Sequence, residues 1–149
     1  MRPRRWTELS TVFPEAKIFC RLFPNERFKC MRALDDILNE VRANIAEACR
    51  RAGRACDEVE ILAVTKTHGP EVVSEAWRAG LRIVAENKVQ EAVWKKNESP
   101  PGPSWHLIGR LQSNKVRHAL ETFDCIHSID SLKLAQRVNF IASDIGAQP

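Results

Sequence analysis

The chain has 149 residues, of which 44% are hydrophobic and 28% are charged, a balance typical of a globular domain and not of a disordered tail. Its net charge of +4 arises in residues 1–30, because the basic and acidic residues after position 30 are equal in number. The five cysteines contain no CxxC pair, which argues against a disulfide framework or a zinc ribbon, and no apolar run reaches the roughly 18 residues of a membrane span. A cytoplasmic protein is therefore expected.

Residues 1–30 form an atypical basic leader without a clear hydrophobic period. Three prolines interrupt any long helix in this segment. Arg2, Arg4 and Arg5 suggest an arm that contacts nucleic acid or a membrane, but so few clustered charges are more typical of a poorly ordered extension. Met31 is an alternative start of the domain, since a periodic pattern begins there.

An amphipathic helix is predicted from Met31 to the glycine at position 53. Its apolar residues recur at steps of three and four, with acidic and basic residues on the other side. The residues of the apolar stripe are Leu34, Ile37, Leu38, Val41, Ile45 and Ala48.

Four units, each a strand followed by a helix, are predicted after this first helix. The last helix is expected to be capped by Asp130 or Ser131. The predicted strands are Val59–Lys66, Leu81–Ala85, Trp105–Ile108 and Cys125–Ile129. The predicted helices are Pro70–Gly80, Val89–Lys96, Leu111–Leu120 and Leu132–Ala142.

The alternation of apolar strands with helices predicts an α/β fold with a parallel sheet. A doubly wound sheet and a (β/α) barrel both satisfy this pattern. No GxGxxG or Walker loop follows the first strand, which favours the barrel. A complete barrel has eight strands, so four predicted strands account for about half of one.

Lys66 is the most informative candidate, because an apolar strand delivers it to a carboxyl end, where both architectures place their chemistry. A lysine there can bind an aldehyde covalently, provided that its surroundings favour the neutral amine. Leu62 and Val64 share its strand face and are expected to form an apolar wall. Taken alone, the local pattern is also that of an ordinary solvated lysine.

Other polar residues follow the next strands. Asn87 is a candidate to hydrogen-bond a ligand or orient Lys66, and it is equally typical of a turn or a helix cap. His106 has the pattern of a hydrogen-bonded core imidazole more than that of a proton carrier. Gly109 would allow the backbone to approach a ligand, or serve a plain turn. The amides of residues 112–114 could receive an anion, although helix capping explains these residues as well.

No metal site is predicted. The four histidines contain no HExxH pair, and Cys125 with His127 forms a two-ligand step without partners at finger spacing. The later basic residues are dispersed among acids and indicate solvated faces instead of a nucleic-acid module. These residues are Arg78, Arg82, Lys95, Lys96, Arg110, Lys115 and Arg117.

Several motifs resemble the pyridoxal phosphate homeostasis protein family, the YggS/PROSC type, across about residues 31–145. They are Ala63–Thr67, the Glu86-Asn87-x-Val89-Gln90-Glu91 run, Trp105–Lys115 and Ser128–Ser131. The resemblance implies the first half of a TIM-type (β/α) barrel of the alanine racemase N-terminal class, over residues 31–149 with a helix in front. It also implies that pyridoxal 5'-phosphate (PLP) is held as a Schiff base on Lys66.

The same resemblance implies a PLP carrier that buffers and delivers the cofactor, without established catalysis. Asn87, His106 and Gly109 are the further cofactor-binding candidates, and apo PLP enzymes are the expected recipients. Family members continue for another half barrel that carries the loops for the cofactor's phosphate, so the chain is expected to be truncated.

Two alternatives remain. A PLP-dependent racemase or decarboxylase would need an acid or base on the opposite cofactor face, typically a tyrosine, and the chain has none. An inactive half barrel would expose strand edges that favour self-association.

Overall fold

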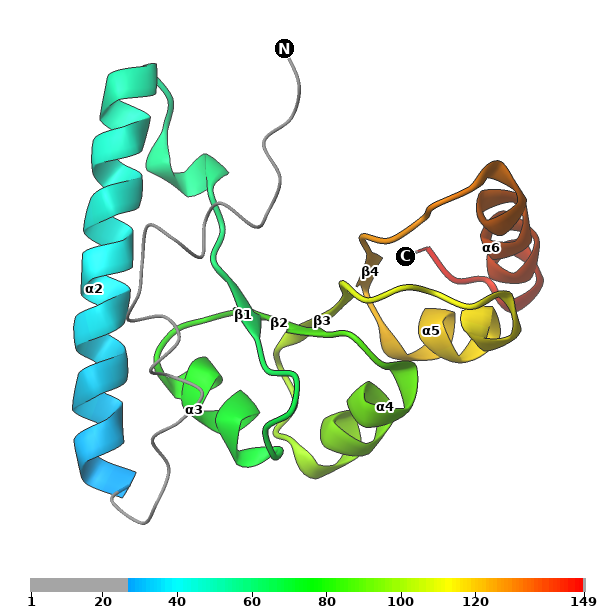
Figure 1. Cartoon of the computed structure of the whole chain (residues 1–149), viewed down its shortest axis with the longest axis horizontal. Coiled ribbons are helices and arrows are strands. Elements are labelled where there is room, and N and C mark those ends of the chain that lie inside the picture. The colour runs from blue at the N-terminus through cyan, green and yellow to red at the C-terminus, as the bar shows by residue number, and fades with distance from the viewer. Residues whose placement is uncertain (1–26, 149) are drawn as a thin grey trace.

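The computed structural model describes residues 27–148, which form one parallel sheet with helices on its flank (Figure 1). The strands are β1 (Leu62–Val64), β2 (Ile83–Glu86), β3 (Ser104–Leu107) and β4 (Cys125–Ile126). The α-helices are α2 (Arg27–Ala52), α3 (Glu71–Arg78), α4 (Val89–Glu98), α5 (Val116–Thr122) and α6 (Leu132–Ile145). Two short 3₁₀ turns, η3 (Cys56–Glu58) and η4 (Ser113–Lys115), complete the order.

The first helix begins at Arg27, four residues before the predicted start at Met31, and it ends where predicted. Gly53 follows it with a φ of 63°, a conformation that glycine adopts without steric cost and that ends a helix. The leader predicted over residues 1–30 lies mostly outside the described residues, so its character stays a prediction.

The sheet order β1-β2-β3-β4 decides between the two predicted architectures. All three neighbouring pairs are parallel and consecutive in the chain. A doubly wound sheet reverses its strand order at a switch point, whereas a barrel adds each new strand next to the previous one. The observed order is therefore that of half a (β/α) barrel, and this prediction is confirmed.

The two faces of the sheet differ in what covers them. Helices α3, α4 and α5 lie along one side of the strands (Figure 1). Alternate strand residues point to this side, and Val84, Trp105 and Leu107 are almost fully buried there. On the other face, the side chain of Val64 is 47% exposed. The main core thus lies between the sheet and its helices.

The first and fourth predicted strands were too long, because parallel pairing covers only two or three residues of each, whereas the second and third are shifted by one or two residues. β1 pairs with β2 from Leu62 to Val64, and β4 pairs with β3 through two residues. The helix predicted to begin near Leu111 starts as the turn η4 and becomes α5 at Val116. Ser131, one of the two predicted caps of α6, accepts a hydrogen bond from the Leu134 amide at 3.3 Å.

None of the helices in residues 27–148 combines the length and apolarity needed to cross a membrane.

Candidate functional site

The loops after all four strands meet at the carboxyl edge of the sheet. Backbone hydrogen bonds continue the parallel pairing past the assigned strand ends, from Thr65 N–H to the Ala85 carbonyl (3.1 Å) and from His127 N–H to the Leu107 carbonyl (2.9 Å). The register therefore places Lys66, the segment that begins at Asn87, and the segment around Gly109 along one edge.

Lys66 is exposed and sits next to an unusual backbone conformation. Thr67 has a φ of 67°, which β-branched residues rarely adopt. Two contacts hold it: its hydroxyl donates to the Lys66 carbonyl at 2.5 Å, and its amide donates to Glu91 Oε1 at 2.9 Å. The backbone around Lys66 is thus fixed by α4, which carries Glu91.

A buried polar network lies beneath this turn and explains its shape. Lys95 Nζ donates to the Thr65 carbonyl (2.7 Å), to Glu86 Oε1 (2.6 Å) and to Glu91 Oε1 (3.0 Å). The Thr65 hydroxyl also donates to Glu86 Oε1 at 2.6 Å. Lys95 and Glu86 are both fully buried, so the prediction of a solvated Lys95 was wrong. Its ammonium instead joins the end of β1 to β2 and α4.

The two carboxyl groups of this network, on Glu91 and Glu86, differ in how completely they are hydrogen-bonded. Burial alone would raise the pKa of the Glu91 carboxyl, but hydrogen bonds from Lys95 and from the Thr67 amide lower this pKa below its ordinary value. The second oxygen of Glu86, Oε2, is buried and has no hydrogen-bond partner among the described residues. The Lys95 ammonium is therefore the main compensation for a carboxylate that water cannot reach.

Lys95 and Lys66 lie at the same edge of the sheet but differ in accessibility. All three donor positions of Lys95 Nζ are used by oxygen acceptors and its side chain is fully buried, so this amine is not accessible to a ligand. Lys66 lies on the exposed surface at the same edge. The apolar wall predicted from Leu62 and Val64 is not closed within the described residues, since Val64 is 47% exposed.

Gly109 has a role that neither predicted alternative stated. A Cβ atom on this residue would lie 2.0 Å from the Asn87 carbonyl oxygen, a distance that real atoms do not tolerate. Ser128 donates a hydrogen bond to the Gly109 carbonyl from the other side. The missing side chain therefore lets the loops after β2, β3 and β4 meet, and it also positions the half-buried Asn87.

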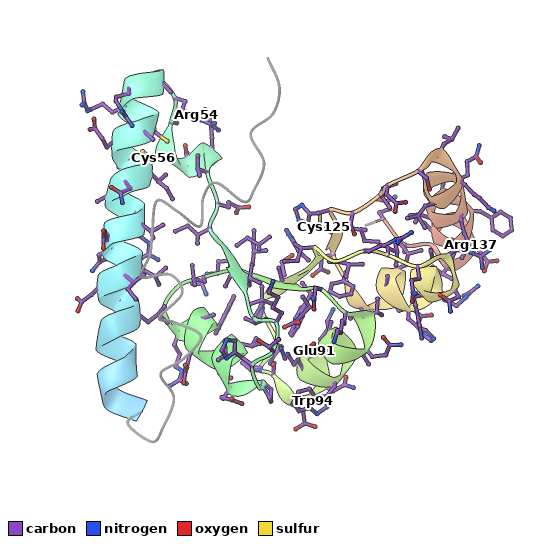
Figure 2. The ribbon with its side chains drawn as sticks, in the orientation of Figure 1. Arg54, Cys56, Glu91, Trp94, Cys125 and Arg137 are labelled. Carbon is purple, nitrogen blue, oxygen red and sulfur yellow. The ribbon has the colours of Figure 1, made fainter. Side chains whose placement is uncertain are left out.

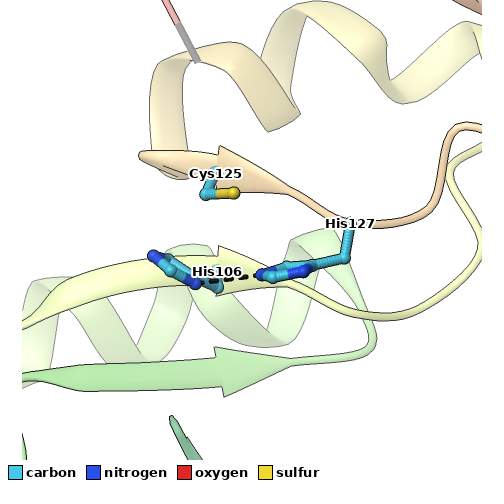
Figure 3. Close-up of side chains that lie close together, drawn as sticks. All are labelled: His106, Cys125 and His127. Atoms are coloured by element: carbon cyan, nitrogen blue, oxygen red, sulfur yellow. Dashed lines mark hydrogen bonds between the residues drawn. The ribbon is translucent and has the colours of Figure 1, made fainter. Parts of the chain in front are cut away.

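His106 occupies the uncovered face of β3, next to two other polar side chains (Figure 3). Its Nδ1 lies 3.0 Å from His127 Nε2, and the Cys125 thiol is close to both rings. Burial, followed by the neighbouring His127, lowers the pKa of His106 below its ordinary range. His106 is thus a hydrogen-bonded imidazole, as the sequence favoured, but its partner is a second histidine.

Sequence reasoning missed two groups of residues. The Glu91–Lys95 pair has the spacing of neighbours on a helix, which is a signal for an ion pair but not for its burial. In the sequence alone, Cys125 and His127 are an isolated pair of possible metal ligands. The register adds His106, because its Cα pairs with that of Cys125 across the two strands.

No family model matches the chain. The pyridoxal phosphate homeostasis protein of Pseudomonas aeruginosa is 44% identical over 110 residues, which are 73% of this chain and 48% of the relative. The chain is a homologue of this family. The family protein of Escherichia coli is also 44% identical, over 106 residues that cover 68% of this chain and 45% of the relative. The chain thus spans about half the length of the curated relatives it matches.

Solved structures agree with this homology. PipY of Synechococcus elongatus, solved with PLP bound, has a TM-score of 0.59 and 43% identity, and the match covers 70% of this chain and 50% of PipY. A protein of unknown function from Bifidobacterium adolescentis reaches a TM-score of 0.72 at 31% identity, covering 84% of this chain and 55% of that protein. The half-barrel fold of the described residues is therefore shared with both.

Proposed function

We propose that the chain binds PLP through Lys66 and serves intracellular PLP homeostasis as a cofactor carrier without catalytic turnover. The observation that carries this proposal is the 44% identity to proteins named for PLP homeostasis, together with a related structure solved with PLP bound. The chain's proposed compartment is the cytoplasm.

The carboxyl edge of the sheet offers PLP an accessible lysine. When bound, PLP supplies an aldehyde that condenses with a primary amine. Lys66 offers an exposed amine there, whereas Lys95 holds its own ammonium in three hydrogen bonds. The fixed turn at Thr67 would hold Lys66 in one position, which lowers the entropy lost on binding.

Asn87 and Gly109 complete the proposed edge. The loop that contains Gly109 packs against the Asn87 backbone. The half-buried Asn87 therefore lies at the same carboxyl edge of the sheet as Lys66. His106 lies on the uncovered face of β3, and its lowered pKa favours a neutral ring there. We propose that Asn87 and Gly109 border the cofactor and that His106 faces its site from the strand.

The test is borohydride trapping of added PLP on the full chain, followed by peptide mapping. We expect an absorption change on mixing and a label at Lys66 that Lys66→Ala removes. Lys88→Ala is the matched control, because Lys88 is also an exposed lysine beyond a strand end. Equal labelling of many surface lysines in the wild type and in Lys66→Ala would overturn the assignment of Lys66.

Absence of turnover needs a separate measurement, since trapping reports binding alone. The PLP-loaded chain is incubated with single amino acids, and racemisation and decarboxylation are followed by chiral chromatography and by release of carbon dioxide. The carrier proposal expects no rate above that of free PLP. A rate that Lys66→Ala abolishes would favour an enzyme instead.

Two partners are proposed. Transfer to an apo PLP enzyme is tested by regain of that enzyme's activity on addition of the loaded chain. Self-association is tested by sedimentation, because β1 and β4 each have one strand neighbour within the described residues and leave an open edge. A monomer at all concentrations would refute pairing through these edges.

A further inference from the structure

We propose that His106, Cys125 and His127 form a binding site for one zinc-class divalent ion on the uncovered face of β3 and β4. Cys125 and His127 are two residues apart along the chain, so strand periodicity places both on the same face. The register then brings His106 beside Cys125 from the neighbouring strand. Figure 3 shows the three side chains gathered together, with the two imidazoles in hydrogen-bond contact.

The distances agree with coordination of one ion. Zinc–nitrogen bonds of about 2.0–2.1 Å at tetrahedral angles place two ligand nitrogens about 3.3 Å apart. His106 Nδ1 and His127 Nε2 are 3.0 Å apart, and the Cys125 Sγ completes a set whose atoms lie within 4.8 Å of one another. A zinc–sulfur bond of about 2.3 Å requires an N···S distance of roughly 3.6 Å, so a modest inward turn of the side chains completes the site.

The types of ligand select the class of metal. Imidazole nitrogen and thiolate sulfur suit zinc and its borderline-soft neighbours, and they do not suit magnesium or calcium, which prefer oxygen. Three protein ligands leave a fourth position, and exposed His127 keeps that position accessible to solvent. An ion with three protein ligands and an open position is typical of reactive sites more than of closed structural sites.

This site shares His106 with the proposed PLP site, so the two proposals are tested by separate measurements. An ion bound by His106 and His127 would fix the His106 ring, and His106 would then not contact PLP directly. The metal experiment uses PLP-free protein, so its result does not depend on whether Lys66 binds the cofactor. The amount of PLP trapped at Lys66 in His127→Asn and in the wild type, each with and without metal, then shows whether metal binding changes PLP binding.

The test is titration of the full, reduced, PLP-free chain with Co²⁺ as a spectroscopic probe for zinc, followed by displacement with Zn²⁺. We expect one equivalent to produce visible bands of tetrahedral cobalt and a near-ultraviolet thiolate-to-cobalt band, both lost when Zn²⁺ is added. Cys125→Ser should abolish the thiolate band, and His127→Asn should weaken binding by about tenfold or more.

Matched controls are Cys56→Ser and His118→Asn, which change an exposed cysteine and an exposed histidine outside the cluster. Both should bind cobalt as the wild type does. Both substitutions alter side-chain size only slightly, and circular dichroism of Cys125→Ser and His127→Asn verifies that these variants fold. The proposal is overturned if the wild type shows no one-to-one complex, or if Cys125→Ser and His127→Asn bind as tightly as the controls.

Discussion

The two faces of the same four strands carry different kinds of polar chemistry. On the face covered by helices, Lys95 and Glu86 are fully buried and joined at 2.6 Å, and Glu91 extends the network. On the other face, His106 and His127 contact each other, and His127 is exposed. Figure 2 shows Glu91 with α4 on the helical side and Cys125 at β4.

This difference indicates how the half barrel divides its tasks. A buried charge pair stabilises only when both partners are present, so the helical face fixes the turn that presents Lys66. The uncovered face carries two imidazoles and a thiol close together, which are the ligands of the proposed metal site. Strand alternation places Glu86 and His106 on opposite faces of the sheet, and helix α4 supplies Glu91 and Lys95 to the helical face.

The largest expected effect is on the helical face. Lys95→Met leaves Glu86 buried without a counter-charge, and we expect a loss of about 3–5 kcal/mol in the free energy of unfolding. Urea denaturation measures this loss, with Lys88→Met as the exposed control. The double variant Glu86→Gln with Lys95→Met should recover part of the stability. A loss below about 1 kcal/mol in Lys95→Met would show that the network does not hold this face together.

A smaller effect is expected at the edge where the two faces meet. Gly109→Ala forces a Cβ atom against the Asn87 carbonyl oxygen, and we expect a cost of about 1–3 kcal/mol in unfolding free energy. The shifted loop should also reduce PLP trapping at Lys66. Gly146→Ala is the control, because no atom lies within 4 Å of its new Cβ and only the backbone penalty remains. Because Gly109 does not have the positive φ of Gly146, a cost below about 1 kcal/mol in Gly109→Ala would remove the steric role assigned to Gly109.

The smallest expected effect is on the pH dependence of stability, and it arises from Glu91 on the helical face. The pKa of Glu91 is lowered in the folded chain, so the unfolded chain takes up this proton first as the pH falls. The contribution of Glu91 to stability is thus present above its ordinary value of 4.5 and is lost as the pH falls through the lower folded value. Glu91→Gln should flatten the acid side of the stability curve.

Urea denaturation between about pH 3 and pH 7 checks this expectation. Glu98→Gln is the control, because Glu98 is exposed on the same helix. Parallel acid curves for the wild type and Glu91→Gln would contradict the lowered pKa of Glu91.

The spacing of apolar residues and the residues that cap or end helices predicted most elements, because these signals depend only on neighbours in the sequence. The end of α2 at Gly53 and the cap of α6 at Ser131 are examples. The length of the first strand was overestimated, since apolar residues such as Ile61 pack against the core without joining the sheet. The burial of Lys95 could not be predicted locally, because its partners Thr65 and Glu86 lie 30 and 9 residues away.

The sequence by itself determined the class of fold, the delivery of Lys66 to a strand end and the resemblance to PLP homeostasis proteins. These depend on short-range patterns and on motifs that are readable in order. Only the tertiary structure decided the strand order, the contact between Gly109 and Asn87, and the grouping of His106 with Cys125 and His127. Each of these depends on the register between strands that are separated by a helix, and local sequence patterns do not specify that register.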